Sequence, residues 1–189
     1  LRRYLRDLQV LADSEGSPWF IVGGHALHSI RTGSPISYYD RDKRFQVWSD
    51  GDIDAFVILP NATYLERTWV PNVIGRLKEK WPGIHMSKTD LRKKKEINVW
   101  KNPGFPGKKQ KILQPVNESP HCAAVLTFYP CFVHNATHVV KKVYRRGLVY
   151  VPSSLYLPVK YVQYGHVLRM PVPNDFLYAA GGGFRDARG

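Results

Sequence analysis

Trp48-Ser49-Asp50-Gly51-Asp52-Ile53-Asp54-Ala55-Phe56-Val57 is the stretch that decides the fold expected of this chain. Because successive side chains of a strand point to opposite faces, Asp50, Asp52 and Asp54 share one face. The apolar residues at the alternate positions share the other face, which suits a hydrophobic core. We therefore predict a long strand over 47–59 that carries three carboxylates on one side.

Three carboxylates at this spacing repel one another unless a cation lies among them or water screens them. Oxygen ligands alone suit Mg²⁺ or Mn²⁺, with phosphate groups completing the shell. We predict that Asp50, Asp52 and Asp54 bind one of these metals. The alternative is a solvated edge strand or an acidic turn, since Asp-Gly is also a hairpin signal.

Upstream of the acidic strand, 19–22 predicts a short buried strand that ends at Gly23 and Gly24, and 25–31 predicts a helix. Backbone N–H groups at a helix start and the helix dipole bind phosphate, and Arg31 would add a cation. The last aspartate of the acidic strand follows Gly24 by 30 residues. This order is typical of nucleotidyltransferase folds, although a glycine pair alone also fits a simple tight turn.

The rest of the chain alternates helix and strand in its first half and is rich in strands and turns in its second. Expected elements are a helix over 1–12, a helix over 62–81 kinked or split at Pro71, short strands at 84–87 and 96–100, a loop over 101–120, strands at 123–133, 148–151 and 159–172, and a closing helix over 174–180. The helix over 62–81 is expected to bury one side, formed by Leu65, Trp69, Val73, Ile74, Leu77 and Trp81. We predict an α/β (α+β) fold with a nucleotidyltransferase-like mixed sheet. Residues 1–100 form its core, and 101–189 form an irregular, strand-rich subdomain that completes the same domain.

The formal net charge of +13 favours anionic partners, such as nucleotides, sugar phosphates, nucleic acid or a membrane surface. No apolar run is long enough to cross a bilayer. The first residue opens directly into a helical pattern without an initiator Met, so we expect an excised domain whose upstream anchor would lie outside it. Three glycosylation sequons begin at Asn61, Asn117 and Asn135 and favour a secretory lumen, with chance as the alternative.

The residues around the glycine turn resemble the first motif of the LicD/fukutin family of phospho-sugar and phosphocholine transferases, Gly-Thr-Leu-Leu-Gly-x-x-Arg. Gly24-His25-Ala26-Leu27-His28-Ser29-Ile30-Arg31 matches it at Gly24, Leu27 and Arg31. Trp48 and the acidic strand resemble the second motif, with one extra residue after the Trp. Met170-Pro171-Val172-Pro173-Asn174-Asp175 resembles a proline-rich third motif.

Two departures from the family pattern concern the site. The Thr and Gly of the first motif are replaced by His25 and His28. The family expects a third carboxylate on a later strand, and Ile97-Asn98-Val99-Trp100 has Asn98 in that place. Glu96 shares a strand face with Asn98 and is the candidate substitute.

The resemblance implies transfer of a phospho-alditol or phosphocholine group from a CDP-activated donor to a hydroxyl of a glycan or glycoprotein. It also implies the secretory lumen, in the Golgi, for a fragment of a type II membrane protein. Gly23, Gly24 and Arg31 would hold the donor phosphates.

The same resemblance assigns the metal and the base. Asp52 and Asp54 would bind Mg²⁺ or Mn²⁺ with support from Asp50, and Glu96 would be the general base for the acceptor hydroxyl. One rival function is a nucleotidyltransferase acting on a small molecule or on nucleic acid, although a nucleic-acid partner is not expected because it explains neither the sequons nor the third motif. Another is a catalytically inactive binding domain, which Asn98 favours.

Basic clusters at 92–95, 108–111 and 141–142 predict solvated loops or an anion-binding surface. Cys122 and Cys131 would form a disulfide, remain free thiols, or bind zinc with neighbouring histidines. The sequence leaves these alternatives open.

Overall fold

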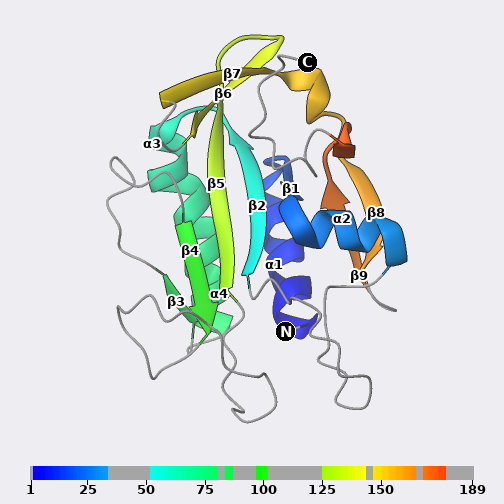
Figure 1. The fold of residues 1–189 in the computed structure, drawn as a ribbon. Coiled ribbons are helices and arrows are strands. Elements are labelled where there is room, and N and C mark those ends of the chain that lie inside the picture. The colour runs from blue at the N-terminus through cyan, green and yellow to red at the C-terminus, as the bar shows by residue number, and fades with distance from the viewer. Residues whose placement is uncertain are drawn as a thin grey trace.

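The sheet is built around β2 (Asp52–Leu59), which lies between β1 (Trp19–Ile21) and β5 (Val125–Val133). β2 pairs antiparallel with β1 and parallel with β5. β5 pairs antiparallel with β4 (Ile97–Lys101), and β4 pairs antiparallel with β3 (Ile84–Met86). The order β1-β2-β5-β4-β3 is therefore a mixed sheet, as Figure 1 shows.

Two more strands extend this sheet past the end of β4. β6 (His138–Val143) pairs with the last residues of β5, and β7 (Gly147–Pro152) pairs with β6, which brings the sheet to seven strands. β8 (Lys160–Tyr164) and β9 (Leu168–Val172) form a separate antiparallel hairpin after the short helix η2 (Ser153–Leu155). Because β5 lies directly beside β2, strands from both halves of the chain form one sheet.

Five helical segments complete the described structure: α1 (Arg2–Glu15), α2 (Gly23–Thr32), α3 (Ala62–Tyr64), η1 (Leu65–Gly75) and α4 (Arg76–Lys80). Figure 1 shows α2 lying beside the β8–β9 hairpin, away from the continuous column formed by α3, η1 and α4. The computed structural model describes residues 2–33, 52–80, 84–86, 97–101, 125–143, 147–164 and 168–177. The predicted α/β (α+β) class is confirmed.

The first core lies between the sheet and the helices α1 and η1. Alternate residues of β2, Ala55, Val57 and Leu59, face it and are fully buried. The residues predicted to form the buried side of the second helix are all buried there, namely Leu65, Trp69, Val73, Ile74 and Leu77. Trp81, predicted for the same side, lies outside the described residues, as do 102–120 of the expected loop.

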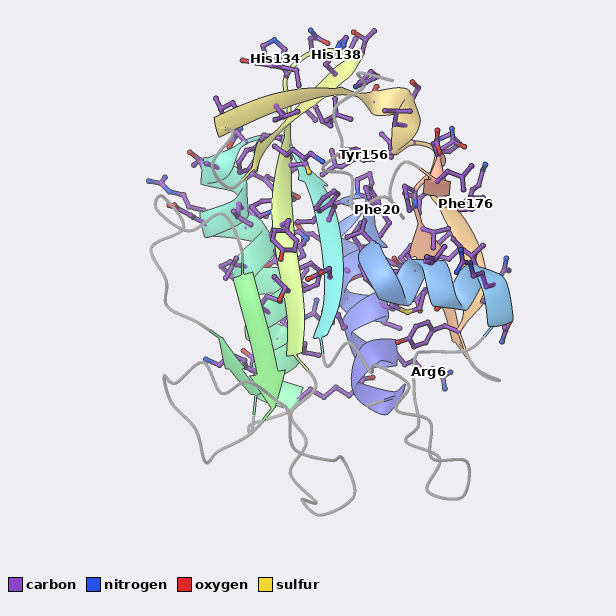
Figure 2. All side chains as sticks on the ribbon, in the orientation of Figure 1. Arg6, Phe20, His134, His138, Tyr156 and Phe176 are labelled. Atoms are coloured by element: carbon purple, nitrogen blue, oxygen red, sulfur yellow. The ribbon has the colours of Figure 1, made fainter. Side chains whose placement is uncertain are left out.

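The second core covers the opposite face of the sheet. Phe56 and Ile58 of β2 pack there with Phe20 and with Tyr156, which follows η2. The Tyr156 ring centroid lies 5.1 Å from that of Phe20 and 5.8 Å from that of Phe56, and Figure 2 shows Phe20 and Tyr156 together. β2 is therefore buried on both faces over its second half, and only its first residues carry carboxylates.

Pro71 does not split the second helix, because α3, η1 and α4 follow one another without a break. Proline lacks an N–H and its ring clashes with the carbonyl four residues earlier in an α-helix. The chain accommodates it in η1, an 11-residue π-helical segment, in which hydrogen bonds span five residues instead of four. The Arg76 N–H, for example, donates to the carbonyl of Pro71.

The strand β6 was not expected from the sequence, and it corrects the interpretation of the basic cluster at 141–142. Lys141 is only 4% exposed and points into the second core. Its Nζ lies 4.9 Å from the centroid of the Phe56 ring and 5.8 Å from that of Tyr156. Burial lowers the pKa of the Lys141 ammonium below its ordinary value. A solvated loop is therefore wrong for Lys141.

Other boundaries differ in smaller ways. The strand expected over 159–172 is the hairpin of β8 and β9, and the strand expected over 47–59 is described from Asp52. Of the closing helix expected over 174–180, the described residues reach 177 and are helical at 176–177. Within the described ranges, no helix combines the length and the apolar character needed to cross a membrane.

Replacing Lys141 by Met should stabilise the protein at neutral pH. The folded-state pKa is lowered, so between that pKa and the ordinary value of 10.5 the unfolded chain binds a proton that the folded chain does not. The cost of burying the charge is thus largest below the folded-state pKa and disappears as the pH rises past 10.5. We expect Lys141→Met to raise the free energy of unfolding by about 1 kcal/mol at neutral pH.

Urea unfolding at several pH values measures this effect, and the advantage of Lys141→Met should shrink towards high pH. The exposed Lys78 provides the matched control, Lys78→Met, which should change the free energy of unfolding little. A variant that is less stable than the wild type at neutral pH would contradict the expectation.

Candidate active site

The acidic strand and the glycine turn meet at the start of α2. The Val22 N–H donates to the carbonyl oxygen of Asp54 at 2.8 Å, which carries the β1–β2 pairing up to the turn. Gly23 follows and opens α2. A Cβ placed on Gly23 would lie 3.7 Å from Oδ2 of Asp54. The carboxylate of Asp54 therefore lies against the turn itself.

A glycine is required at this point because Gly23 has a φ of +68°, in the left-handed region. The preceding Val22 is extended and makes no side-chain cap, and the first turn of α2 contains no acidic residue. The N–H groups of a first helical turn lack intrahelical partners and carry partial positive charge. Asp54 thus places a negative charge beside the positive end of α2.

The three central strands align the site in register. Asp54 of β2 pairs with Thr127 of β5, and Thr127 pairs on its other side with Asn98 of β4. Residues directly opposite one another on neighbouring strands project to the same face of a sheet. Residue 98 therefore lies in register with Asp54 across the sheet, but Thr127 on β5 lies between the two positions.

Thr127 was missed by the sequence analysis. The sequence shows it as a threonine within the apolar and aromatic run Val125-Leu126-Thr127-Phe128-Tyr129. This run predicts a strand and gives no sign that the threonine pairs with an aspartate. The side chain is 4% exposed. Thr127 is the residue of β5 that pairs directly with Asp54 of β2.

The other predicted site residues are placed as follows. Asp52 begins β2 two positions before Asp54, and Gly24 is the second residue of α2. Arg31 is exposed in the last turn of α2, about 12 Å along the axis from Gly23 at ~1.5 Å per residue. The fold therefore does not bring Arg31 to the glycine turn. Asp50 and Glu96 lie outside the described residues.

The cysteine alternatives are narrowed by Cys131, which is a free and fully buried thiol in the second core. The disulfide to Cys122 is therefore wrong, although Cys122 itself lies outside the described residues. Burial raises the pKa of the Cys131 thiol to about 12, whereas zinc requires a thiolate. His134, the expected zinc partner, is exposed after the end of β5 beside Tyr150, where Figure 2 shows it near His138.

Two of the sequon asparagines have structural roles. Oδ1 of Asn61 accepts from the Tyr64 N–H at 2.8 Å and caps α3. Oδ1 of Asn135 accepts from the N–H groups of Thr137 and His138, each at 2.9 Å, in the turn between β5 and β6. Asn117 lies outside the described residues.

The mixed sheet, with its acidic strand beside a glycine turn, has a nucleotidyltransferase-like fold. The chain is similar to the lincomycin-bound crystal structure of the lincosamide antibiotic adenylyltransferase LnuA, with a TM-score of 0.50. The sequences are 11% identical, over 96% of this chain and 87% of that one, so the likeness concerns the fold alone. No protein-family profile matches the chain, and no curated protein matches it.

Gly23→Ala should destabilise the protein by about 1–2 kcal/mol, because an L-residue is strained at positive φ. The new Cβ would make an ordinary contact with Asp54 at 3.7 Å, so strain and not a clash is the cause. Gly75→Ala is the control, since a Cβ there meets nothing closer than 3.8 Å inside a helix and should stabilise by about 0.5–1 kcal/mol. Denaturant unfolding measures both, and a Gly23→Ala protein as stable as the wild type would contradict the role of the turn.

Cys131 should resist thiol reagents in the folded protein. A Cys122→Ser variant leaves Cys131 as the single cysteine, since the chain has two. We expect no rapid reaction with a disulfide reagent at mildly alkaline pH, and one thiol per chain once denaturant is added. Rapid labelling of the folded variant would show that the second core opens more easily than its burial implies.

Proposed function

We propose that this chain is a metal-dependent nucleotidyltransferase that transfers a nucleotidyl group to a hydroxyl of a small molecule. The observation that carries the proposal is the contact between the Asp54 carboxylate and the glycine turn, 3.7 Å from a Cβ on Gly23. Carboxylates would bind the metal, and N–H groups at a helix start would bind phosphate. The carboxylates and the helix start must therefore lie close enough to bind one metal–nucleotide complex.

Asp52 and Asp54 would hold Mg²⁺ or Mn²⁺, with Asp50 in support, because carboxylate oxygens on one strand face suit these hard cations. When bound, the metal would neutralise charge on the donor phosphates. The N–H groups of Gly23 and Gly24 would bind a phosphate oxygen at the start of α2. Arg31 lies at the other end of α2 and would bind a more distant part of the donor.

The reaction joins the acceptor and the donor at one phosphorus atom. The acceptor hydroxyl oxygen attacks the α-phosphorus of a nucleoside triphosphate, and the bond from that phosphorus to pyrophosphate breaks. The hydroxyl proton passes to a general base, for which we propose Glu96. A small-molecule acceptor is favoured because a solved structure of similar fold is named as an antibiotic adenylyltransferase.

A second candidate is favoured by the sequence motifs at Gly24 to Arg31 and at Trp48 to Asp54, which resemble the LicD/fukutin family. Here a glycan or glycoprotein hydroxyl attacks the β-phosphorus of a CDP-activated phospho-alditol or phosphocholine donor, and CMP leaves. A secretory, Golgi location and an upstream membrane anchor belong to this candidate. The same site residues would serve it.

Phosphorus NMR separates the two candidates, because the products differ. The protein is incubated with Mg²⁺ or Mn²⁺, a mixture of hydroxyl-bearing acceptors, and either nucleoside triphosphates or CDP-choline. Pyrophosphate release supports the first candidate and CMP release the second. Donor binding without turnover of any donor would support an inactive binding domain.

Asp54→Asn should lower the affinity for the metal–nucleotide complex by about 100-fold or more, since even outer-shell partners of metal ligands contribute roughly 10–100-fold. The fold should persist, because the lost attraction between the carboxylate and the start of α2 costs only about 1 kcal/mol. Titration calorimetry with Mg²⁺ and ATP or CDP-choline measures the affinity. Glu79→Gln, on the exposed side of α4, is the control. Unchanged affinity in Asp54→Asn would refute the metal assignment.

A further inference from the structure

Thr127 carries a hydroxyl group in a buried part of β5. Its side chain is 4% exposed, and its neighbour Phe128 is fully buried on the first core. A buried hydroxyl without a hydrogen bond is costly, so such a group is expected to have a partner. Thr127 and Asp54 both take part in interactions within the structure.

The register identifies which partner is close. Thr127 pairs directly with Asp54, and the next pair, Phe128 with Ala55, faces the first core with both side chains fully buried. Strand alternation therefore directs Thr127 and Asp54 together to the opposite face. Neighbouring strands lie about 4.8 Å apart, so a hydroxyl and a carboxylate at paired positions are within reach of each other.

We propose that Thr127 is a positioning residue whose hydroxyl donates a hydrogen bond to the Asp54 carboxylate. Asp54 is then held between two structures, the glycine turn on the β1 side and Thr127 on the β5 side. The bond favours the ionised carboxylate and restricts its rotation, so that its remaining lone pairs are directed at the metal. The functional part of this inference rests on the proposed metal–nucleotide site.

The hydrogen bond itself is tested without any ligand, by a double-mutant cycle of unfolding. Thr127→Val keeps the shape and the strand propensity while removing the hydroxyl, and Asp54→Ala removes the acceptor. We expect their effects on the unfolding constant to depart from additivity by about fivefold. A cycle between Asp54→Ala and Thr68→Val, a half-buried threonine on η1, should be additive. Additivity of the Thr127 cycle would overturn the inference.

Positioning is tested by calorimetry with Mg²⁺–ATP and Mg²⁺–CDP-choline. Thr127→Val should lower the affinity for the metal complex by roughly tenfold, as expected for a partner of a metal ligand, with little change for the metal-free nucleotide. Thr127→Ser keeps the hydroxyl and should restore the wild-type affinity. Equal losses in the Val and Ser variants, or equal losses with and without metal, would contradict positioning.

The two proposals fail separately. If the wild type binds neither metal complex, the proposed function is wrong, and the unfolding cycle still decides whether Thr127 holds Asp54. If the wild type binds and Thr127→Val binds equally well, the site stands and the role of Thr127 is wrong.

Discussion

The double burial of β2 is the constraint on which the rest of the structure depends. Its second half has apolar side chains on both faces, so helices must cover one side and an aromatic cluster the other. Apolar burial contributes roughly 25 cal/mol per Å², and this strand contributes side chains to both hydrophobic clusters of the described residues. The carboxylates at its first residues are thereby held at the edge of a rigid element. A site built on such a strand is more accurately positioned than one built on a loop.

The second core shows how the later part of the chain supports this strand. β6 places Lys141 over the Phe56 ring and beside Cys131, its cross-strand partner. A buried ammonium is costly, and the contacts with two aromatic rings offset part of that cost. Tyr156 closes the cluster from outside the sheet, where its ring contacts both Phe20 and Phe56. β5, Lys141 of β6 and Tyr156 are therefore structural partners of the acidic strand.

The chemistry proposed for the site depends on the position of the Asp54 carboxylate and on the uncharged residues that pair with it across the sheet. Asp54 lies against the positive end of α2, while its in-register neighbours on β5 and β4 are Thr127 and Asn98. Neither neighbour is acidic. In the proposed site the carboxylates for a metal would therefore come from β2, and phosphates would supply much of the remaining negative charge. This arrangement suits a metal that arrives with a nucleotide.

The sequence by itself determined the elements whose signals are local. Strand alternation identified β2 and its apolar face, helical spacing identified the buried residues of η1 and α4, and the glycine pair identified the turn at the start of α2. Only the tertiary structure decided what is set by pairing between distant segments. It placed β5 beside β2, so that Thr127 pairs with Asp54. It buried Lys141 in β6, a strand that the two adjacent lysines made hard to predict. It also placed Arg31 away from the glycine turn. Register between strands more than 70 residues apart depends on packing, which no local pattern encodes.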